Sequence, residues 1–194
     1  TLIIFSSDNG PVLNDGYYDD SDVKNGSHTP WGPYRGGKYS LFEAGTRVPF
    51  FTYWKGKIKP GVSDTMVSQL DLLSSLAQLV GSEVRTEDSL PLLELLMGQS
   101  NYGRKEMVIE ATSRTAFKRG DWVMIPPYDG FAVNDKVKIE LGNDSDFQLY
   151  NLSNDVGQQN NLALQNPKKL QEMLLAFEAI RGKDYRKTEK LELK

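Results

Sequence analysis

The sequence predicts an α/β chain of two parts, residues 1–104 and 105–194. Three observations carry this prediction. Leu2 to Phe5 is a continuously apolar run, as is typical of a strand covered on both faces of a mostly parallel sheet. Apolar residues recur at helical spacing from Asp64 to Val80. In the second part, short β-like runs are followed by one amphipathic helix, the pattern of a small α+β layer.

The first part starts with the apolar run and continues into a long loop. Pro11 to Glu43 is rich in Gly, Pro, Asn, Asp and Tyr, so we expect irregular structure, and loops of this length are usually functional or disordered. Val48 to Trp54 is predicted to form a second buried strand. Because the apolar run starts at Leu2, we also expect the chain to be a piece of a larger fold that starts inside a domain.

Two helices are predicted next. From Asp64 to Val80 the apolar residues share one helical face, with Asp64 as N-cap and Gly81 just beyond the end. We expect this helix to pack on the sheet. A shorter helix is predicted from Ser89 to Met97, closed by Gly98.

The second part is predicted to form an antiparallel sheet and one helix. The four predicted strands are Met107 to Ala111, Thr115 to Lys118, Trp122 to Ile125 and Phe147 to Leu149. The helix has Asn166 as N-cap, Pro167 as its first residue and Gly182 at its end. Its predicted apolar face consists of Leu170, Met173, Leu174, Phe177 and Ile180.

Composition narrows the classes of function. The formal net charge of -3 provides no basic surface for nucleic acid, so that class of partner is set aside. The absence of cysteine excludes disulfides, thiol nucleophiles and zinc–cysteine sites in this chain. No apolar stretch reaches the ~20 residues that cross a bilayer, so no membrane span is predicted. Thr1 is followed directly by strand sequence, so we expect any export signal to lie upstream.

Asp8-Asn9-Gly10 follows the first predicted strand closely, where open α/β sheets place their ligand sites. A carboxylate and an amide carbonyl are hard oxygen donors of the kind that calcium or magnesium prefers. Asn-Gly is also the strongest short hairpin signal, and these three residues by themselves favour a turn. Pro11 weakens that preference, because it lacks the N–H that a returning strand would need. The residues alone leave a turn and a metal site open.

The segment Gly32 to Tyr39 nearly matches a phosphate-binding loop. The match fails because Tyr39 stands where a magnesium-binding hydroxyl is required, and the preceding residues form no strand pattern. What remains is Arg35 and Lys38 on a flexible backbone, suited to an anionic group. A solvated loop with ordinary basic residues is an equally good interpretation of this segment alone.

His28 is the only histidine, so any histidine-based proton transfer within this chain must use it. No Gly-x-Ser-x-Gly nucleophile motif accompanies it. Loop histidines without a further signal are more often surface residues. If the loop folds over a site, His28 can reach the substrate, so it is kept as a candidate substrate contact.

Three segments, taken in order, resemble the second half of the type I sulfatases, which are relatives of alkaline phosphatase. They are Thr1 to Pro11, Arg35 to Lys38 and Glu43 to Pro49. The likeness continues in Trp54 to Ile58, Ser68 to Leu73, Lys118 to Trp122, Leu149 to Leu152 and Asn161 to Ala163. The resemblance implies that residues 1–104 are a remnant of an alkaline-phosphatase-like sandwich, the C-terminal part of a catalytic domain. Residues 105–194 would form a C-terminal α+β subdomain.

The resemblance also implies site residues. Asp8 and Asn9 would help to hold a calcium ion, and Lys38 would contact the sulfate group. Arg35 and Glu43 would support the loop. A divalent cation polarises sulfate oxygens, and an ammonium stabilises the charge that grows as the S–O bond breaks. The expected substrate is a sulfated small molecule or glycan, and the expected compartment is periplasmic, secreted or lysosomal.

One departure from the family bears on activity. The family's nucleophile is a formylglycine made in a Cys/Ser-x-Pro-x-Arg motif, which this chain lacks. We therefore expect the nucleophile upstream and expect the chain alone to be inactive.

A strand without its neighbouring strands should also favour self-association. Two alternatives stay open: a phosphatase or phosphonate-ester hydrolase of the same superfamily, and a non-catalytic binding module.

Overall fold

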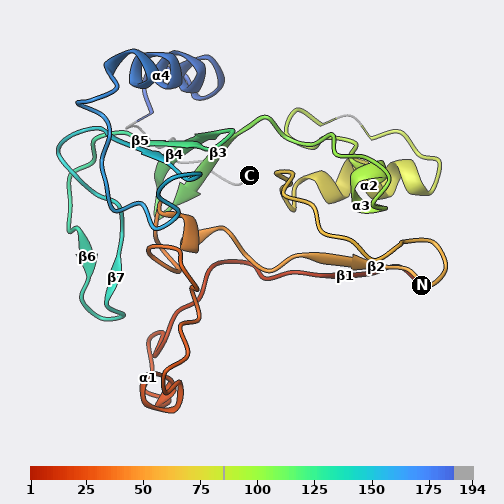
Figure 1. Cartoon of the computed structure of the whole chain (residues 1–194), viewed down its shortest axis with the longest axis horizontal. Helices are drawn as coiled ribbons and strands as arrows, with labels where there is room; N and C mark the ends of the chain where they lie inside the picture. Colours follow the sequence, from red (N-terminus) through yellow and green to blue (C-terminus); the bar gives the residue numbers. More distant parts are fainter. Residues whose placement is uncertain (85, 186–194) are drawn as a thin grey trace, which may run out of the picture. The chain divides into compact units, whose positions relative to one another are not determined.

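The computed structural model describes residues 1–84 and 86–185 (Figure 1). Its contacts group into two compact units. Unit 1 comprises Thr1–Ser6 and Pro49–Lys105, and unit 2 comprises Ser7–Val48 and the chain from Glu106 on. Unit 2 therefore joins the long loop to the C-terminal residues. The division into domains 1–104 and 105–194, which follows sequence order, stays a prediction.

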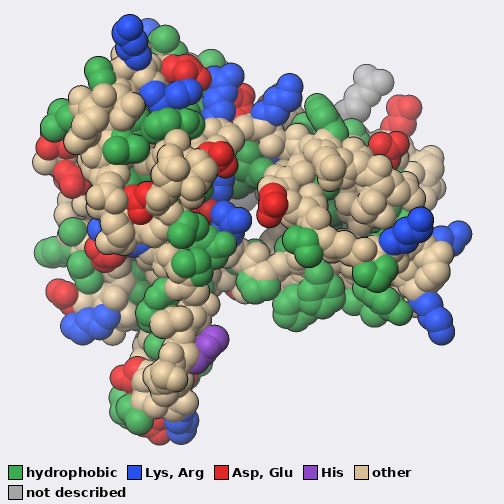
Figure 2. Space-filling view, viewed as in Figure 1, with side chains coloured by type: hydrophobic (Ala, Val, Ile, Leu, Met, Phe, Trp, Pro, Cys, Tyr) green, Lys and Arg blue, Asp and Glu red, His purple; other side chains and the backbone are tan. Residues whose placement is uncertain are grey.

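Unit 1 contains a two-stranded antiparallel sheet. β1 (Ile3–Phe5) pairs with β2 (Phe51–Tyr53), so both predicted strands form. Among the described residues β1 pairs only with β2, and the pair is antiparallel, so these residues do not form the mostly parallel sheet that is expected to cover this strand on both faces. Phe5 and Phe51 stack with ring centroids 4.9 Å apart, yet both are about half exposed. Figure 2 shows hydrophobic side chains open to solvent over this sheet. Self-association through them stays a prediction.

The main helix of unit 1, α2 (Asp71–Leu79), starts later than predicted. The prediction that Asp64 caps this helix is wrong. The backbone before Asp71 is instead bonded to a distant segment, since the Arg104 N–H donates to the Met66 carbonyl at 2.9 Å. A backbone segment held in this way is not available to extend the helix.

The end of α2 is confirmed, whereas the second predicted helix is much shorter. Gly81 has a φ of 72°, and the Ser82 N–H donates to a carbonyl in the last turn, the pattern of a Schellman motif. α3 (Leu93–Leu96) is a single turn. Its predicted first turn does not form, because the Ser89 hydroxyl and carbonyl are hydrogen-bonded to Ser74.

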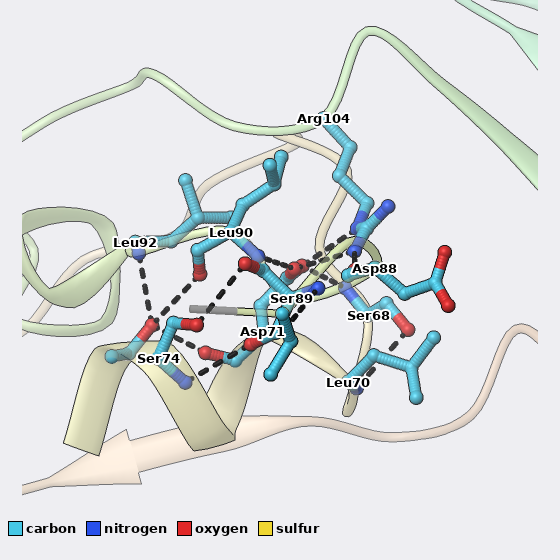
Figure 3. Close-up of polar contacts among 11 residues, drawn as sticks. Ser68, Leu70, Asp71, Ser74, Asp88, Ser89, Leu90, Leu92 and Arg104 are labelled. Carbon is cyan, nitrogen blue, oxygen red and sulfur yellow. Dashed lines mark hydrogen bonds and ion pairs between the residues drawn. The ribbon is translucent and has the colours of Figure 1, made fainter. Parts of the chain in front are cut away.

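A buried carboxylate organises unit 1 (Figure 3). Asp71, at the start of α2, is 0% exposed. It accepts hydrogen bonds from the Leu90 N–H (2.9 Å), the Ser68 N–H (2.9 Å) and the Arg104 guanidinium (2.6 and 2.8 Å). A buried charge is tolerated only when it is paired and hydrogen-bonded, and this arrangement meets both conditions. Segments far apart in the sequence are thereby joined at one side chain.

Unit 2 is built on a four-stranded antiparallel sheet, as predicted, and the order of its strands is β3-β4-β5-β8. The strands are β3 (Glu106–Ala111), β4 (Arg114–Arg119), β5 (Trp122–Ile125) and β8 (Gln148–Asn151). The side chains of β5 alternate between the two faces. Val123 and Ile125 belong to one core cluster, and Met124 belongs to the other.

A different segment covers each face of this sheet. α4 (Pro167–Arg181) packs Met173 and Phe177 against the face that carries Met124. Leu41 and Phe42, from the long loop, pack in the cluster on the other face. The loop is therefore part of the core of unit 2 rather than a solvated appendage.

The predicted bounds of α4 are confirmed, from Pro167 to the residue before Gly182. One predicted core residue is wrong, because Ile180 is 53% exposed. Tyr185 packs beside the Phe177 ring instead, with 5.4 Å between the ring centroids.

Four short elements have no counterpart in the sequence prediction. They are α1 (Ser21–Lys24), the 3-10 turn η1 (Glu43–Gly45), β6 (Val133–Asn134) and β7 (Ile139–Glu140). Elements of two to four residues are too short to show a helical or strand period. The rest of the loop is irregular, as expected.

Glu43 joins the long loop to the sheet of unit 2. The residue is 3% exposed and starts η1. Its carboxylate accepts the Lys118 ammonium at 2.8 Å from both oxygens and the Arg47 guanidinium at 3.2 Å. Its backbone N–H donates to the Gln158 side chain at 2.7 Å. Strand β4, the loop and the segment after β8 are thus tied to one residue.

We expect Glu43→Ala to lower the free energy of unfolding of unit 2 by about 3–5 kcal/mol, because it leaves the Lys118 ammonium, 15% exposed, without its partner. Denaturation with urea, followed by tryptophan fluorescence, measures this loss. The matched control is Glu106→Ala, which removes an exposed pair with Arg119 and should cost less than about 1 kcal/mol. Equal losses in the two variants would contradict the role of Glu43.

Asp71→Asn should loosen unit 1. The substitution keeps the shape of the side chain but removes the negative charge that faces Arg104, and it turns an NH2 group toward backbone N–H donors. We therefore expect the free energy of unfolding of unit 1 to fall by about 3–5 kcal/mol. Hydrogen exchange measured over residues 68–92 should become faster. Asp88→Asn, in the same segment but with an exposed carboxylate, should leave the exchange unchanged. A similar change in both variants would refute the role assigned to Asp71.

Candidate functional site

Asp8-Asn9-Gly10 does not form the turn of a β-hairpin. β1 pairs with β2 and not with the residues that follow Gly10. The Gly10 N–H donates to the Gly45 carbonyl at 2.8 Å. Gly10 is buried, and a Cβ atom at this position would collide with the Ala44 carbonyl oxygen. Only glycine allows this approach, so Gly10 fixes the backbone of Asp8 and Asn9 against η1.

The two side chains before Gly10 supply oxygen donors. Asp8 is exposed, and its Oδ1 accepts the Asn9 N–H at 3.0 Å. The Asn9 amide group donates through Nδ2 to the Gly10 carbonyl at 2.9 Å, and in the described part of the chain its Oδ1 receives no hydrogen bond. The Ser7 hydroxyl donates to the Asn9 carbonyl at 3.0 Å and holds the segment in place.

These donors fit one side of a calcium site. A carboxylate and an amide oxygen on adjacent residues are typical calcium ligands, but the ion takes six to eight oxygens in total. Among residues 1–84 and 86–185 there is no group of three or more His, Cys, Asp or Glu that could hold a metal ion. Asp8 and Asn9 offer two oxygen donors, fewer than a complete calcium shell requires.

Backbone hydrogen bonds bring the sequence motifs of the loop together. The Lys38 N–H donates to the Pro11 carbonyl at 2.9 Å, directly after the Asp8-Asn9-Gly10 segment. The Ala44 N–H donates to the Arg35 carbonyl at 3.0 Å. With the bond from Gly10 to Gly45, these contacts join the three motif segments into one local structure.

The Lys38 side chain is paired with a residue that sequence reasoning missed. Its Nζ lies 2.5 Å from Oδ2 of Asp15, whose Oδ1 accepts the Tyr39 hydroxyl at 2.7 Å. The hydrogen bond to Asp15 raises the pKa of Lys38, so the ammonium form is favoured. The hydrogen bond from Lys38 lowers the pKa of Asp15, and the bond to Asp15 raises the pKa of Tyr39. Asp15 belongs to no motif, so no sequence signal could have found it.

Arg35 supports the loop rather than facing solvent. Its Nε and Nη2 donate to the Glu140 carboxylate of β7 at 2.8 and 2.6 Å, and its Nη1 donates to the Gln158 carbonyl at 2.8 Å. Its guanidinium also lies 4.0 Å from the centre of the Phe42 ring. The hydrogen bond between the two side chains raises the pKa of Arg35 and lowers that of Glu140.

His28 lies on the exposed part of the loop, after α1 (Figure 2, purple). Its backbone N–H donates to the Asn25 carbonyl at 3.1 Å. Within the described residues its imidazole makes no hydrogen bond and no ion pair. The contact of His28 with substrate therefore stays a prediction.

Among the described residues, no helix is both long enough and apolar enough to cross a membrane.

Comparisons with known proteins show which family the chain resembles. Residues 1–82 match the family model described as Sulfatase. The chain is 42% identical over 185 residues to an N-acetylgalactosamine-6-O-sulfatase of Bacteroides thetaiotaomicron, an alignment that covers 93% of this chain and 36% of the relative. It is 36% identical over 109 residues to human arylsulfatase A, covering 55% of this chain and 20% of the relative.

Solved structures give the same result for the fold. A structure from work on glycosaminoglycan metabolism by Bacteroides thetaiotaomicron matches with a TM-score of 0.88 and 40% identity, covering 93% of this chain and 38% of that one. A sulfatase from Pseudoalteromonas sp. matches with a TM-score of 0.70 at 22% identity, which shows the fold alone, over 97% of this chain and 38% of that one. The prediction of an α/β chain with the alkaline-phosphatase-like fold of the sulfatases is confirmed. The chain spans little more than a third of the length of these two structures, and over residues 1–82 it matches the sulfatase family.

Proposed function

We propose that the chain is the C-terminal portion of a calcium-dependent sulfatase that hydrolyses sulfate esters. In the intact protein Asp8 and Asn9 hold one side of the calcium ion, and Lys38 contacts the sulfate group. The observation that best supports this proposal is the hydrogen-bonded arrangement of the motif segments. The backbone hydrogen bonds from Gly10 to Gly45 and from Lys38 to Pro11 hold the segment that carries Asp8 and Asn9 next to the segment that carries Lys38.

The residues of this chain have two tasks in the proposed reaction. When bound, calcium supplies polarisation of the sulfate oxygens. Asp8 and Asn9 orient that ion through rigid backbone, since Gly10 fixes their position against η1. The Lys38 ammonium stabilises the negative charge that develops on the bridging oxygen as the S–O bond breaks. His28 is a candidate contact for the rest of the substrate.

The nucleophile is assigned to another part of the intact protein. The Cys/Ser-x-Pro-x-Arg motif that yields formylglycine does not occur in the 194 residues. We therefore expect the 194-residue chain by itself to be inactive. An exported or lysosomal location is proposed for the intact protein, on the resemblance alone.

A sulfated carbohydrate is the proposed substrate class. The relative with 42% identity is named as an N-acetylgalactosamine-6-O-sulfatase, and it aligns over 93% of this chain. Arylsulfatase A aligns over a smaller share, 55%. An N-acetylgalactosamine 6-sulfate is therefore the first substrate to test, with a chromogenic aryl sulfate beside it.

The intact protein is expected to hydrolyse these sulfate esters in the presence of calcium. Asp8→Ala and Asn9→Ala should each weaken calcium binding, measured by calorimetry, and should lower kcat/KM by about 100-fold, because each removes an oxygen ligand. Lys38→Ala should lower kcat by about 100- to 1,000-fold, as the loss of one charge-stabilising donor does elsewhere.

Asp22→Ala serves as the control for these variants, because it removes an exposed carboxylate of the same loop that accepts a hydrogen bond from the Val23 N–H. It should leave calcium affinity and kcat/KM unchanged. Faster hydrolysis of the matching phosphate ester would favour a phosphatase instead. Calcium affinity that is unaffected by both ligand substitutions would argue that Asp8 and Asn9 do not bind the ion.

A further inference from the structure

One carboxylate holds two neighbouring side chains of the proposed site. Each oxygen of Asp15 bonds a different partner, Lys38 at 2.5 Å and Tyr39 at 2.7 Å. The Lys38 ammonium also lies 5.2 Å from the centre of the Tyr39 ring. The side chains of Asp15 and Lys38 are similarly sheltered, 27% and 28% exposed. These contacts form a small closed cluster within unit 2.

The backbone around Lys38 is fixed, but its side chain needs a separate anchor. The Lys38 N–H is bonded to Pro11, and a Cβ atom on Gly37 would lie 2.6 Å from the same carbonyl oxygen, so the two segments are in close contact. Tyr39 has a φ of 77°, a left-handed conformation that is uncommon for an aromatic residue. A lysine side chain keeps four rotatable bonds beyond a fixed backbone, and its ammonium is a mobile point charge. Asp15 restricts that freedom.

We propose that Asp15 is a positioning residue, which holds the Lys38 ammonium in place for the sulfate group of the substrate and is itself oriented by the hydrogen bond from the Tyr39 hydroxyl. The proposal rests on the proposed function of Lys38. A donor that is held in its working geometry before the reaction stabilises developing charge without a cost of reorganisation. The alternative role is that the Asp15 carboxylate occupies the position of the sulfate group and has to leave before the substrate binds. In that case removal of its charge would lower KM and leave kcat unchanged.

Kinetics of the intact protein separate these two roles. Asp15→Asn keeps the size of the side chain and an acceptor for Tyr39 but removes the charge that holds Lys38. We expect kcat to fall by about 10- to 100-fold without a decrease in KM, and Asp15→Glu to recover part of kcat. Asp22→Asn, the matched loss of one negative charge from the same loop, should change neither constant. A lower KM with kcat maintained, or no change in either constant, would overturn the proposal.

The reactivity of Lys38 gives a second measurement that does not need turnover. Acetic anhydride modifies the free amine, so the pairing with Asp15 should protect Lys38. Peptide mass spectrometry of the intact protein should show several-fold faster acetylation of Lys38 in Asp15→Asn, with Lys24, an exposed lysine of the same loop, as the internal reference. Circular dichroism of the variant shows whether the fold is kept.

The two measurements distinguish failure of this inference from failure of the proposed function. If the intact protein hydrolyses sulfate esters but the acetylation of Lys38 is unchanged in Asp15→Asn, the positioning role is overturned and the function stands. If acetylation of Lys38 becomes faster but no sulfate ester is hydrolysed, Asp15 does pair with Lys38, and both the proposed function and the positioning role in catalysis are overturned.

Discussion

The candidate site depends on one interaction, the buried ion pair between the Glu43 carboxylate and the Lys118 ammonium. The charge of Glu43 is compensated by Lys118 from strand β4 and by Arg47, so η1 is held against the sheet. Because η1 is fixed, the Gly45 carbonyl can receive the Gly10 N–H, which sets the backbone of Asp8 and Asn9. A solvated ion pair would give little rigidity, whereas a buried and fully hydrogen-bonded one restricts every group around it.

Unit 1 uses the same physical device with different residues. Asp71 is completely buried and joins the start of α2 to Leu90 and Arg104, segments that share no local pattern with it. In both units a carboxylate that would be costly to bury alone gathers enough donors to be stable, and the chain folds around it. Neither carboxylate has solvent access, so both serve the architecture. The chemistry is proposed for the exposed Asp8 and the partly exposed Lys38.

Close backbone contacts complete the site. Gly10 lies against the Ala44 carbonyl and Gly37 against the Pro11 carbonyl, and a larger residue at either position would push two segments apart. Sequence reasoning marked these glycines as turn or loop signals, and the structure shows that they allow the segments to approach each other. The position of Lys38 thus follows from packing of the backbone, and its side chain is then held by Asp15.

The sequence by itself determined the elements with a long enough period and clear end signals. The strands β3, β4, β5 and β8, the helix α4 and the glycine end of α2 all follow from local patterns of apolar residues and caps. Ordered motifs also carried the family resemblance. Only the tertiary structure decided the late start of α2, the hairpin of β6 and β7, and the pairing of Asp15 with Lys38. Each of these features depends on contacts between residues that are far apart in the sequence. No local pattern of residues predicts such contacts, because they form only when the backbone has folded.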